Sequence, residues 1–270
     1  MKTKKVLFIT QEIVPYVPES AMALSGRNIP QAVQESGVEI RTFMPRWGNI
    51  NERRNQLHEV IRLSGINIII DDTDHPLIIK VSSIPSARMQ VYFIDNDDYF
   101  HKRRMMVDDK GEEYEDNAER AIFYARGVLE AVKKSRWFPD VIHCHGWMSA
   151  LAPLYVKTAY REDPLFANAK VVFSAYNDFP QKAPLANFEN TLLYRDVNKQ
   201  MLEETGINLS SPEALKQFAV AFSDGIIQGE PGAGADILKM AQEKNLPILE
   251  YPGMENLGKI YGDFYDNLFE

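Results

Sequence analysis

The chain has 270 residues, of which 45% are hydrophobic and 25% charged, and it carries a formal net charge of −8. This composition is ordinary for a globular protein, and the length suffices for one large α/β domain. An acidic chain gains little from a phosphate backbone, so nucleic acid is not expected as a partner. No apolar run approaches the ~20 residues of a membrane span, and one cysteine excludes an internal disulfide framework. We therefore expect a cytoplasmic protein with no membrane partner.

The amino-terminal half is dominated by short apolar runs that predict strands. These runs cover residues 5–10, 38–44, 66–70, 77–82 and 90–94. A helical pattern spans residues 20–36, although Pro30 should bend or interrupt that helix. The strongest helical pattern spans residues 117–135, with Asp116 as its N-cap and Glu119 three residues further on.

The carboxyl-terminal half alternates strands and helices. Strands are predicted at residues 141–144, 170–175, 225–228 and 246–250, and helices at residues 149–160, 212–222, 233–244 and 256–268. Such alternation is typical of an α/β fold with a mostly parallel sheet and helices on both faces. Since no linker rich in Gly, Ser or Pro interrupts the chain, we expect residues 1–270 to form a single domain.

Two histidines mark the most informative stretch of the sequence. His143 and His145 lie at the end of a predicted strand, where open α/β sheets bind ligands, and their side chains point the same way. Gly146 allows a sharp turn, and Ser149 is placed to cap the following helix. A metal site would need a third and usually a fourth ligand, and no partner is visible. We expect neither a metal nor a cofactor, and favour core packing or a hydrogen bond near a ligand.

Three other features are weak candidates for a functional site. The loop Gly229–Asp236 follows a strand and opens a helix, but it lacks the third glycine of a dinucleotide fingerprint and the Lys-Ser of a P-loop. Its amides could hold an anion, yet a turn without a ligand is favoured. Lys102–Arg104 is expected to be solvated surface and Cys144 a buried strand residue. No nucleophile elbow supports a serine hydrolase.

Three groups of motifs occur in a characteristic order. They are Lys5–Pro15 with Met44–Ile50, Val91–Asn96 with Tyr114–Arg120, and His143–Trp147. Together, over roughly residues 5–222, they resemble the bacterial glycogen synthase and plant starch synthase family. Members of that family transfer glucose from ADP-glucose to a growing α-1,4-glucan.

The resemblance implies the GT-B architecture, in which two Rossmann-like domains face each other across a cleft. The amino-terminal domain mainly carries the glucan acceptor, and the carboxyl-terminal domain binds most of the nucleotide-sugar. This chain has the length of the amino-terminal half, so we expect a Rossmann-like domain without the nucleotide-sugar domain.

The resemblance also supplies candidate site residues. His145, Asp116 and Asn177 match site positions of the family, and Trp147 and Glu12 are further candidates for binding a ligand. Trp147 either stacks on a sugar or packs under the following helix. No residue is assigned a catalytic role, although His145 and Asp116 are the family-matching positions.

Several departures from the family pattern concern the same site. Where the family has Lys-Thr-Gly-Gly-Leu-Ala-Asp, this chain has residues 18–24, with Glu19 adding negative charge and Ser20 and Ala21 obstructing a close approach. The family's His-Asp-Trp becomes His-Gly-Trp at residues 145–147, and its Thr-Ile-His-Asn becomes Ser-Ala-Tyr-Asn at residues 174–177. The lysine and paired glycines that approach a phosphate are therefore missing.

Three functions follow from these patterns. The first is a glycogen synthase-like domain without autonomous glucosyl transfer, which binds a sugar or an α-glucan. The second is an ADP-glucose glycogen synthase component that is active only when a partner, or a second copy, supplies the donor domain. The third is an interaction or regulatory protein that uses the apolar stripe Leu257, Ile260, Phe264 and Leu268 as a dimer contact, unless this stripe is ordinary core.

Overall fold

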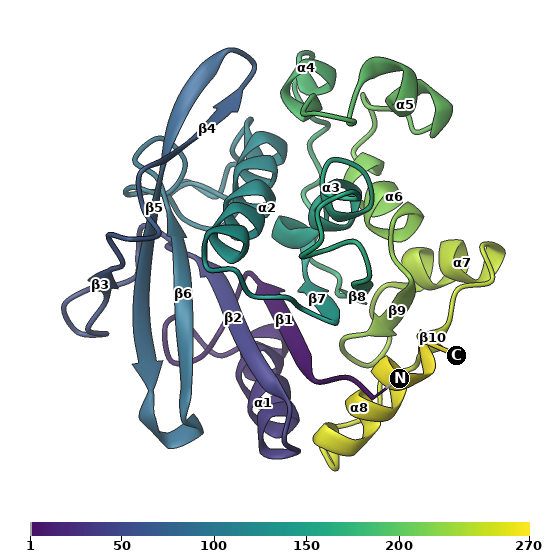
Figure 1. The fold of residues 1–270 in the computed structure, drawn as a ribbon. Coiled ribbons are helices and arrows are strands. Elements are labelled where there is room, and N and C mark those ends of the chain that lie inside the picture. The colour runs from purple at the N-terminus through teal and green to yellow at the C-terminus, as the bar shows by residue number, and fades with distance from the viewer. Residues whose placement is uncertain (1) are drawn as a thin grey trace.

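A mostly parallel sheet forms the centre of the fold. The computed structural model describes residues 2–270, and its strands follow the order β10-β9-β8-β7-β1-β2-β6-β5-β3, with β4 paired to β5 (Figure 1). The strands are β1 (Lys5–Thr10), β2 (Glu39–Pro45), β3 (His58–Glu59), β4 (Ile66–Ile70), β5 (Thr73–Ile84), β6 (Met89–Asp95), β7 (Val141–His145), β8 (Lys170–Ala175), β9 (Gly225–Gln228) and β10 (Ile248–Leu249).

The strand order reverses between β1 and β7. The chain passes from β1 to β2 on one side and later places β7 on the other side, with both neighbours parallel to β1. Thr10 at the end of β1 is in register with His145 at the end of β7. In open α/β sheets, ligands bind outside the carboxyl ends of the strands at such a reversal. The fold therefore places the predicted histidine pair at the expected crevice.

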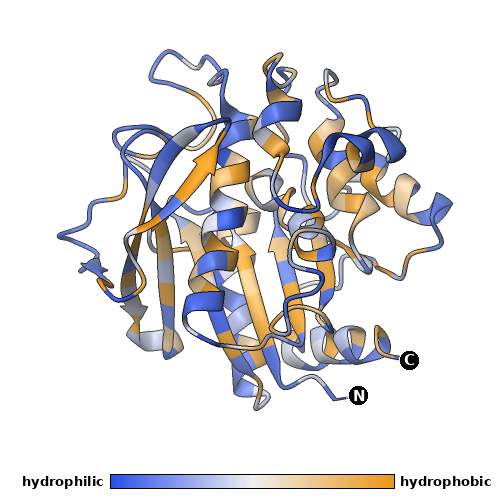
Figure 2. Cartoon of the chain, turned by 45° about the horizontal axis from the view of Figure 1, so that its top comes forward, coloured by the Kyte–Doolittle hydropathy of each residue, from blue (hydrophilic) through white to orange (hydrophobic). Residues whose placement is uncertain are grey.

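Helices cover both faces of the sheet, which confirms the predicted fold class. The helices are α1 (Ala21–Glu35), α2 (Asn117–Lys134), α3 (Ala152–Lys157), α4 (Phe188–Leu192), α5 (Lys199–Glu204), α6 (Ala214–Ala221), α7 (Ala235–Glu243) and α8 (Leu257–Asn267), with short 3-10 helices η1 (Pro85–Ala87) and η2 (Trp147–Ser149). α1 and α8 contribute to the core on one face, and α2, α3, α6 and α7 pack over the other. Figure 2 shows the apolar strands between these layers.

The stripe on α8 belongs to the core. Leu257, Phe264 and Leu268 are at least nine-tenths buried and pack with residues of β1 and α1, while Ile260 is half-buried. Gly258 lies so close to α1 that a Cβ would be 2.6 Å from the carbonyl oxygen of Ala32. The stripe is therefore occupied within the chain, and the prediction that it forms a dimer contact loses its basis.

The helix boundaries correct three local predictions. Of the two effects expected at Pro30, the interruption does not occur: α1 runs through Pro30, because the buried residues around it hold that face of the helix against the core. Ser149 does not cap the next helix: α3 begins at Ala152, where Pro153 fits a first turn, and the Ser149 hydroxyl donates to the Gly146 carbonyl at 2.9 Å.

The third correction concerns the start of α2. Asp116 is the N-cap residue, but its side chain accepts no helix amide and pairs with Arg103 instead. Glu119 does not complete a capping box, because its carboxylate accepts the hydroxyl of Tyr99. Tertiary partners thus outcompete the local cap that the sequence indicates.

Some elements had no sequence signal. β3, α4 and α5 were not predicted, and β5 is longer than the apolar run within it. These elements are short or continue into polar residues, so periodicity does not reveal them. Among residues 2–270, no helix has the length and apolar character to cross a membrane.

Candidate functional site

Three loops meet at the carboxyl ends of β1, β7 and β8, a region that we call the carboxyl edge. It comprises residues 11–12, 146–148 and 176–178. The Asp178 carboxylate joins the three loops: its Oδ2 accepts Nε2 of Gln11 at 2.9 Å and the backbone N–H of Trp147 at 3.1 Å. The reversal of strand order brings these loops to one edge of the sheet, and the Asp178 side chain links them by hydrogen bonds.

The two histidines lie beneath this edge and are completely buried. Their rings stack with centroids 4.0 Å apart, which confirms that both side chains point the same way. His143 has a partner at each nitrogen, Nδ1 with the Tyr265 hydroxyl and Nε2 with the Ser174 hydroxyl, both at 2.7 Å. Burial, with a smaller contribution from His145, holds the pKa of His143 well below its usual range. His143 is therefore a neutral histidine of the core.

Among the described residues 2–270, His145 has no hydrogen-bond partner at either ring nitrogen. Burial lowers its pKa to about 3, so the ring is neutral at physiological pH. Because the side chain is 0% exposed, neither nitrogen reaches solvent or an open cleft. In residues 2–270, no group of three or more His, Cys, Asp or Glu residues is arranged to hold a metal ion.

Trp147 is 1% exposed and lies in the main core cluster. Its indole ring therefore offers no face on which a sugar could stack. This burial favours the alternative in which Trp147 packs inside the domain. Cys144 is also buried, and burial raises the pKa of its thiol.

Asp116 is half-buried and held in an ion pair. Both of its carboxylate oxygens accept the guanidinium of Arg103, Oδ2 at 2.8 Å. Arg103 also lies over the ring of Tyr114, 4.4 Å from the centroid. The prediction that Lys102–Arg104 is solvated surface is thus wrong for Arg103, because the Asp116 carboxylate, 13 positions along the chain, binds it. Lys102 and Arg104 are exposed.

Glu12 is tied to the loop that departs most from the family pattern. The Ser20 hydroxyl donates to the Glu12 carboxylate and accepts the backbone N–H of Ala23 at 3.0 Å. Ser20 is therefore the N-cap of α1. Glu12 and Ser20 thus satisfy polar groups at the start of α1, where the resemblance places a phosphate-binding loop.

Asn177 explains the glycine-containing loop before α7. Its side-chain oxygen accepts the backbone N–H of Gly234 at 3.0 Å. Gly229 faces the ring of Tyr176 so closely that a Cβ would lie 2.4 Å from it. These contacts favour the prediction that this loop is a turn without a ligand. Gly229 leaves room for the ring of Tyr176, and the amide of Gly234 donates to Asn177.

Gln11 and Asp178 are residues that the sequence analysis missed. Gln11 lies across Gly146, and its Oε1 accepts the backbone N–H of Met148 at 3.1 Å. Burial and the charge of Glu12 raise the pKa of Asp178 to about 7, although its hydrogen bonds with Trp147 and Gln11 oppose the shift. Both residues follow a strand end, and that position was the signal available in the sequence.

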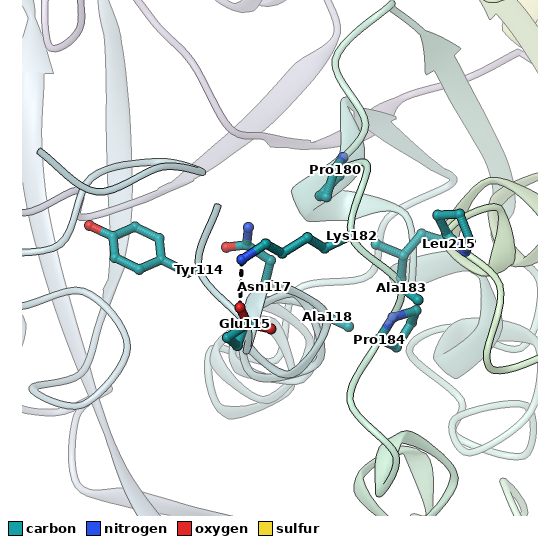
Figure 3. A pocket seen from close by; sticks show the side chains of 10 residues that line it. Tyr114, Glu115, Asn117, Ala118, Pro180, Lys182, Ala183, Pro184 and Leu215 are labelled. Carbon is teal, nitrogen blue, oxygen red and sulfur yellow. Dashed lines mark hydrogen bonds and ion pairs between the residues drawn. The ribbon is translucent and has the colours of Figure 1, made fainter. Parts of the chain in front are cut away.

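Residues 179–184, which we call the strap, run from the carboxyl edge to the loop before α2. The Glu113 carboxylate accepts the backbone N–H groups of Gln181 and Lys182, both at 2.8 Å. The Lys182 ammonium pairs with Glu115 at 2.5 Å. Figure 3 shows Lys182 reaching Glu115 across a narrow hollow that the strap and the start of α2 enclose.

Comparisons with known proteins agree with the motifs. Residues 5–247 match the family described as "Starch synthase catalytic domain". The chain is 35% identical over 240 residues to the glycogen synthase of Chlorobium luteolum, covering 85% of this chain and 49% of that protein. It is 39% identical over 178 residues to the glycogen synthase of Chlorobium limicola, covering 66% of this chain and 36% of that protein. The chain thus spans half or less of the length of these relatives.

A solved structure shares the fold. It is the catalytic domain of starch synthase IV from Arabidopsis thaliana, bound to ADP and acarbose, which matches with a TM-score of 0.71 at 18% sequence identity. The match covers 93% of this chain and 51% of that chain. At this identity, the likeness shows a common architecture for the described residues.

Proposed function

The chain belongs to the starch synthase catalytic domain family, and from this membership we propose a glycogen synthase-like domain that binds a sugar or an α-glucan without autonomous glucosyl transfer. Acceptor binding is the role that the family resemblance gives to the amino-terminal half. The proposed ligand contacts come from the exposed or half-buried polar residues of the carboxyl edge, Glu12 and Asn177. Carboxylate and amide oxygens suit the hydroxyl groups of a sugar.

The observation that carries this proposal is the loop before α1. Transfer from a nucleotide-sugar needs positive charge or oriented donors at the departing diphosphate. Here Glu19 brings a negative charge, and the amide of Ala23 is already bonded to Ser20, which also binds Glu12. The loop therefore supplies a carboxylate and a helix cap in place of a site for phosphate.

The burial of His145 supports the same conclusion. A histidine that contacts a sugar or takes part in transfer must present a nitrogen to the ligand. His145 presents none, and its low pKa keeps it from supplying a positive charge at neutral pH. Asp116, the other family-matching position, directs both carboxylate oxygens to Arg103.

The test measures binding and transfer separately with the purified chain. Calorimetric titration with maltotriose and longer maltooligosaccharides should show binding. Incubation with glycogen and labelled ADP-glucose should leave the glycogen unlabelled. Glycogen that becomes labelled by the chain alone would show that the proposal of an inactive domain is wrong. Absence of binding to any of the oligosaccharides would remove the glucan-binding role.

A second candidate function keeps glucosyl transfer, with a partner or a second copy supplying the donor-binding half. The glycogen synthases that this chain resembles are matched over half or less of their length, so the matched part is one half of such an enzyme. The experiment adds the separately produced carboxyl-terminal half of the Chlorobium luteolum protein to this chain. Labelling of glycogen only in the mixture would favour this function, and an inactive mixture would favour the binding domain. The matched control mixes that half with the amino-terminal half of its own enzyme.

A further inference from the structure

The backbone amides that follow β7 are already occupied. After Gly146, the N–H of Trp147 is bonded to Oδ2 of Asp178 and the N–H of Met148 to Oε1 of Gln11. These two amides lie where the strand order reverses, the place at which open α/β sheets receive ligands. A carboxylate of the chain thus takes the position in which an external oxygen ligand would be expected.

Asp178 is held in this position from both sides. Gln11 donates to Asp178 at 2.9 Å while its own oxygen binds Met148, so the two side chains form one connected arrangement. On the other side, Asp178 continues into the strap, whose amides at residues 181 and 182 are bonded to Glu113. The arrangement is therefore anchored to both β7 and the loop before α2.

The charge around these amides is negative. Glu12 also contacts the Nε2 group of Gln11, at 3.4 Å, and burial together with the Glu12 charge raises the pKa of Asp178. In residues 2–270, no hydrogen bond or ion pair joins Asp178 or Glu12 to a cationic side chain. One oxygen of Asp178, Oδ1, is buried and has no partner in the described part of the chain. A phosphate entering here would meet the Glu12 carboxylate and the carboxyl group of Asp178 without a compensating cation.

We propose that Asp178 is a specificity-determining residue: as an internal ligand it occupies the amide of Trp147, beside the amide of Met148 that Gln11 occupies, excludes phosphate groups from this pair of amides, and so limits the carboxyl edge to uncharged hydroxyl ligands. The exclusion follows from these contacts and from the charge of Glu12. The preference for uncharged hydroxyl ligands rests on the proposed function.

The experiment replaces Asp178 with alanine and, as a second small variant, with serine. The matched control is Glu112→Ala, which removes one negative charge from an exposed residue whose side chain makes no hydrogen bond in the described structure. Each chain is titrated with inorganic pyrophosphate at constant ionic strength and, separately, with maltotriose. Hydrogen exchange at the amide of Trp147 is followed by NMR with and without pyrophosphate.

Three results are expected. Exchange at Trp147 becomes at least tenfold faster in the Asp178 variants, pyrophosphate binds those variants at least tenfold more tightly than the wild type, and pyrophosphate slows exchange at Trp147 only in the variants. The Glu112→Ala chain should behave as the wild type. Unchanged exchange at Trp147, or equal affinity of all chains for pyrophosphate, would overturn the proposal.

The maltotriose titration separates this proposal from the proposed function. If the wild type binds no maltotriose but the Asp178 variants gain pyrophosphate binding, the exclusion of phosphate is correct and the sugar-binding function is wrong. If the wild type binds maltotriose and the variants gain nothing, the function stands and Asp178 has no part in selectivity. Circular dichroism confirms that at least one of the two variants is folded before either result is counted.

Discussion

The polar groups beneath α8 and those of the carboxyl edge are close neighbours in the sheet, yet their hydrogen bonding differs. Under α8, His143 is bonded at both nitrogens, to Tyr265 and Ser174. At the carboxyl edge and just below it, Oδ1 of Asp178 and both nitrogens of His145 are buried and have no partner within the residues that the structure describes. Two histidines separated by one residue thus lie in a satisfied and an unsatisfied environment.

This difference shows where the fold gains stability and where it gives stability up. A buried polar group without a partner costs about 1–3 kcal/mol, and most such groups in folded proteins are paired. His143 under α8 follows this rule, so its hydrogen bonds serve the stability of the domain. The carboxyl edge departs from the rule where the topology predicts a ligand crevice, and such departures are expected at functional sites.

The largest predicted effect concerns the satisfied region. Tyr265 is completely buried in the cluster under α8, so Tyr265→Ala removes a large side chain and leaves His143 without one partner. We expect the free energy of unfolding to fall by about 4–5 kcal/mol, measured by urea denaturation. Tyr265→Phe, which removes only the hydroxyl, should lose about 1–2 kcal/mol. A loss below about 1 kcal/mol in Tyr265→Ala would show that α8 adds little stability and would break the comparison.

The pH dependence of stability tests the unsatisfied region. Burial raises the pKa of Asp178 from its ordinary value of 3.8 to about 7, so the folded state binds this proton more tightly than the unfolded state. The contribution of protonated Asp178 to the free energy of unfolding is therefore complete below about pH 4, and it is lost as the pH rises through about 7. Relative to Asp178→Asn, the wild type should lose about 2–4 kcal/mol of unfolding free energy between about pH 4 and pH 8. Parallel pH profiles of the two chains would contradict the raised pKa.

Any side chain at Gly146 should destabilise the fold, including the aspartate that the family has at this position. Its backbone has φ 79° and ψ 172°, a region almost reserved for glycine, and a Cβ would lie 2.5 Å from Oε1 of Gln11 and 2.8 Å from Cε of Met22. We expect Gly146→Ala to lower the free energy of unfolding by about 2 kcal/mol. Gly146→Asp, which restores the residue of the family, should cost at least as much and restore no glucosyl transfer. Wild-type stability in Gly146→Asp would show that the edge can rearrange around the family residue.

The sequence predicted much of the framework because periodicity carries that information. The buried strands β1 and β8 contain continuous apolar runs, and α2 has a helical pattern along its length, so their positions follow from local composition. The family motifs, which are collinear along the chain, then placed these elements in a known architecture. The caps were harder to predict, as Asp116 illustrates, because Arg103, which lies outside the helix, competes for its carboxylate.

The arrangement of the site could not be predicted from the sequence, because it depends on contacts between residues that are far apart in the chain. Nothing local indicates that Asp178 bonds Gln11, a residue 167 positions away, or that Gly229 gives room to Tyr176. The burial of His145 and Trp147 also depends on how loops from three strands close over them. Residue type and position in the chain identified where a ligand crevice is expected, but tertiary contacts determine which side chains occupy that place.

The smallest predicted effect tests how the strap supports the carboxyl edge. Glu113 is partly exposed, so Glu113→Ala should lower the free energy of unfolding by only about 0.5 kcal/mol, while hydrogen exchange at Gln181 and Lys182 becomes several-fold faster. Glu112→Ala, on the same loop, is the matched control and should change neither quantity.

The exchange rate at Trp147 in the Glu113→Ala chain then distinguishes two causes for the closed edge. If exchange at Trp147 rises together with that at Gln181, the strap holds Asp178 in place, and the unsatisfied region is maintained from outside by the loop before α2. If only Gln181 and Lys182 respond, the bonds of Asp178 with Gln11 and Trp147 suffice. In that case the residues of the carboxyl edge keep it closed without the strap, and the positions of its unpartnered groups are set by the ends of β1, β7 and β8.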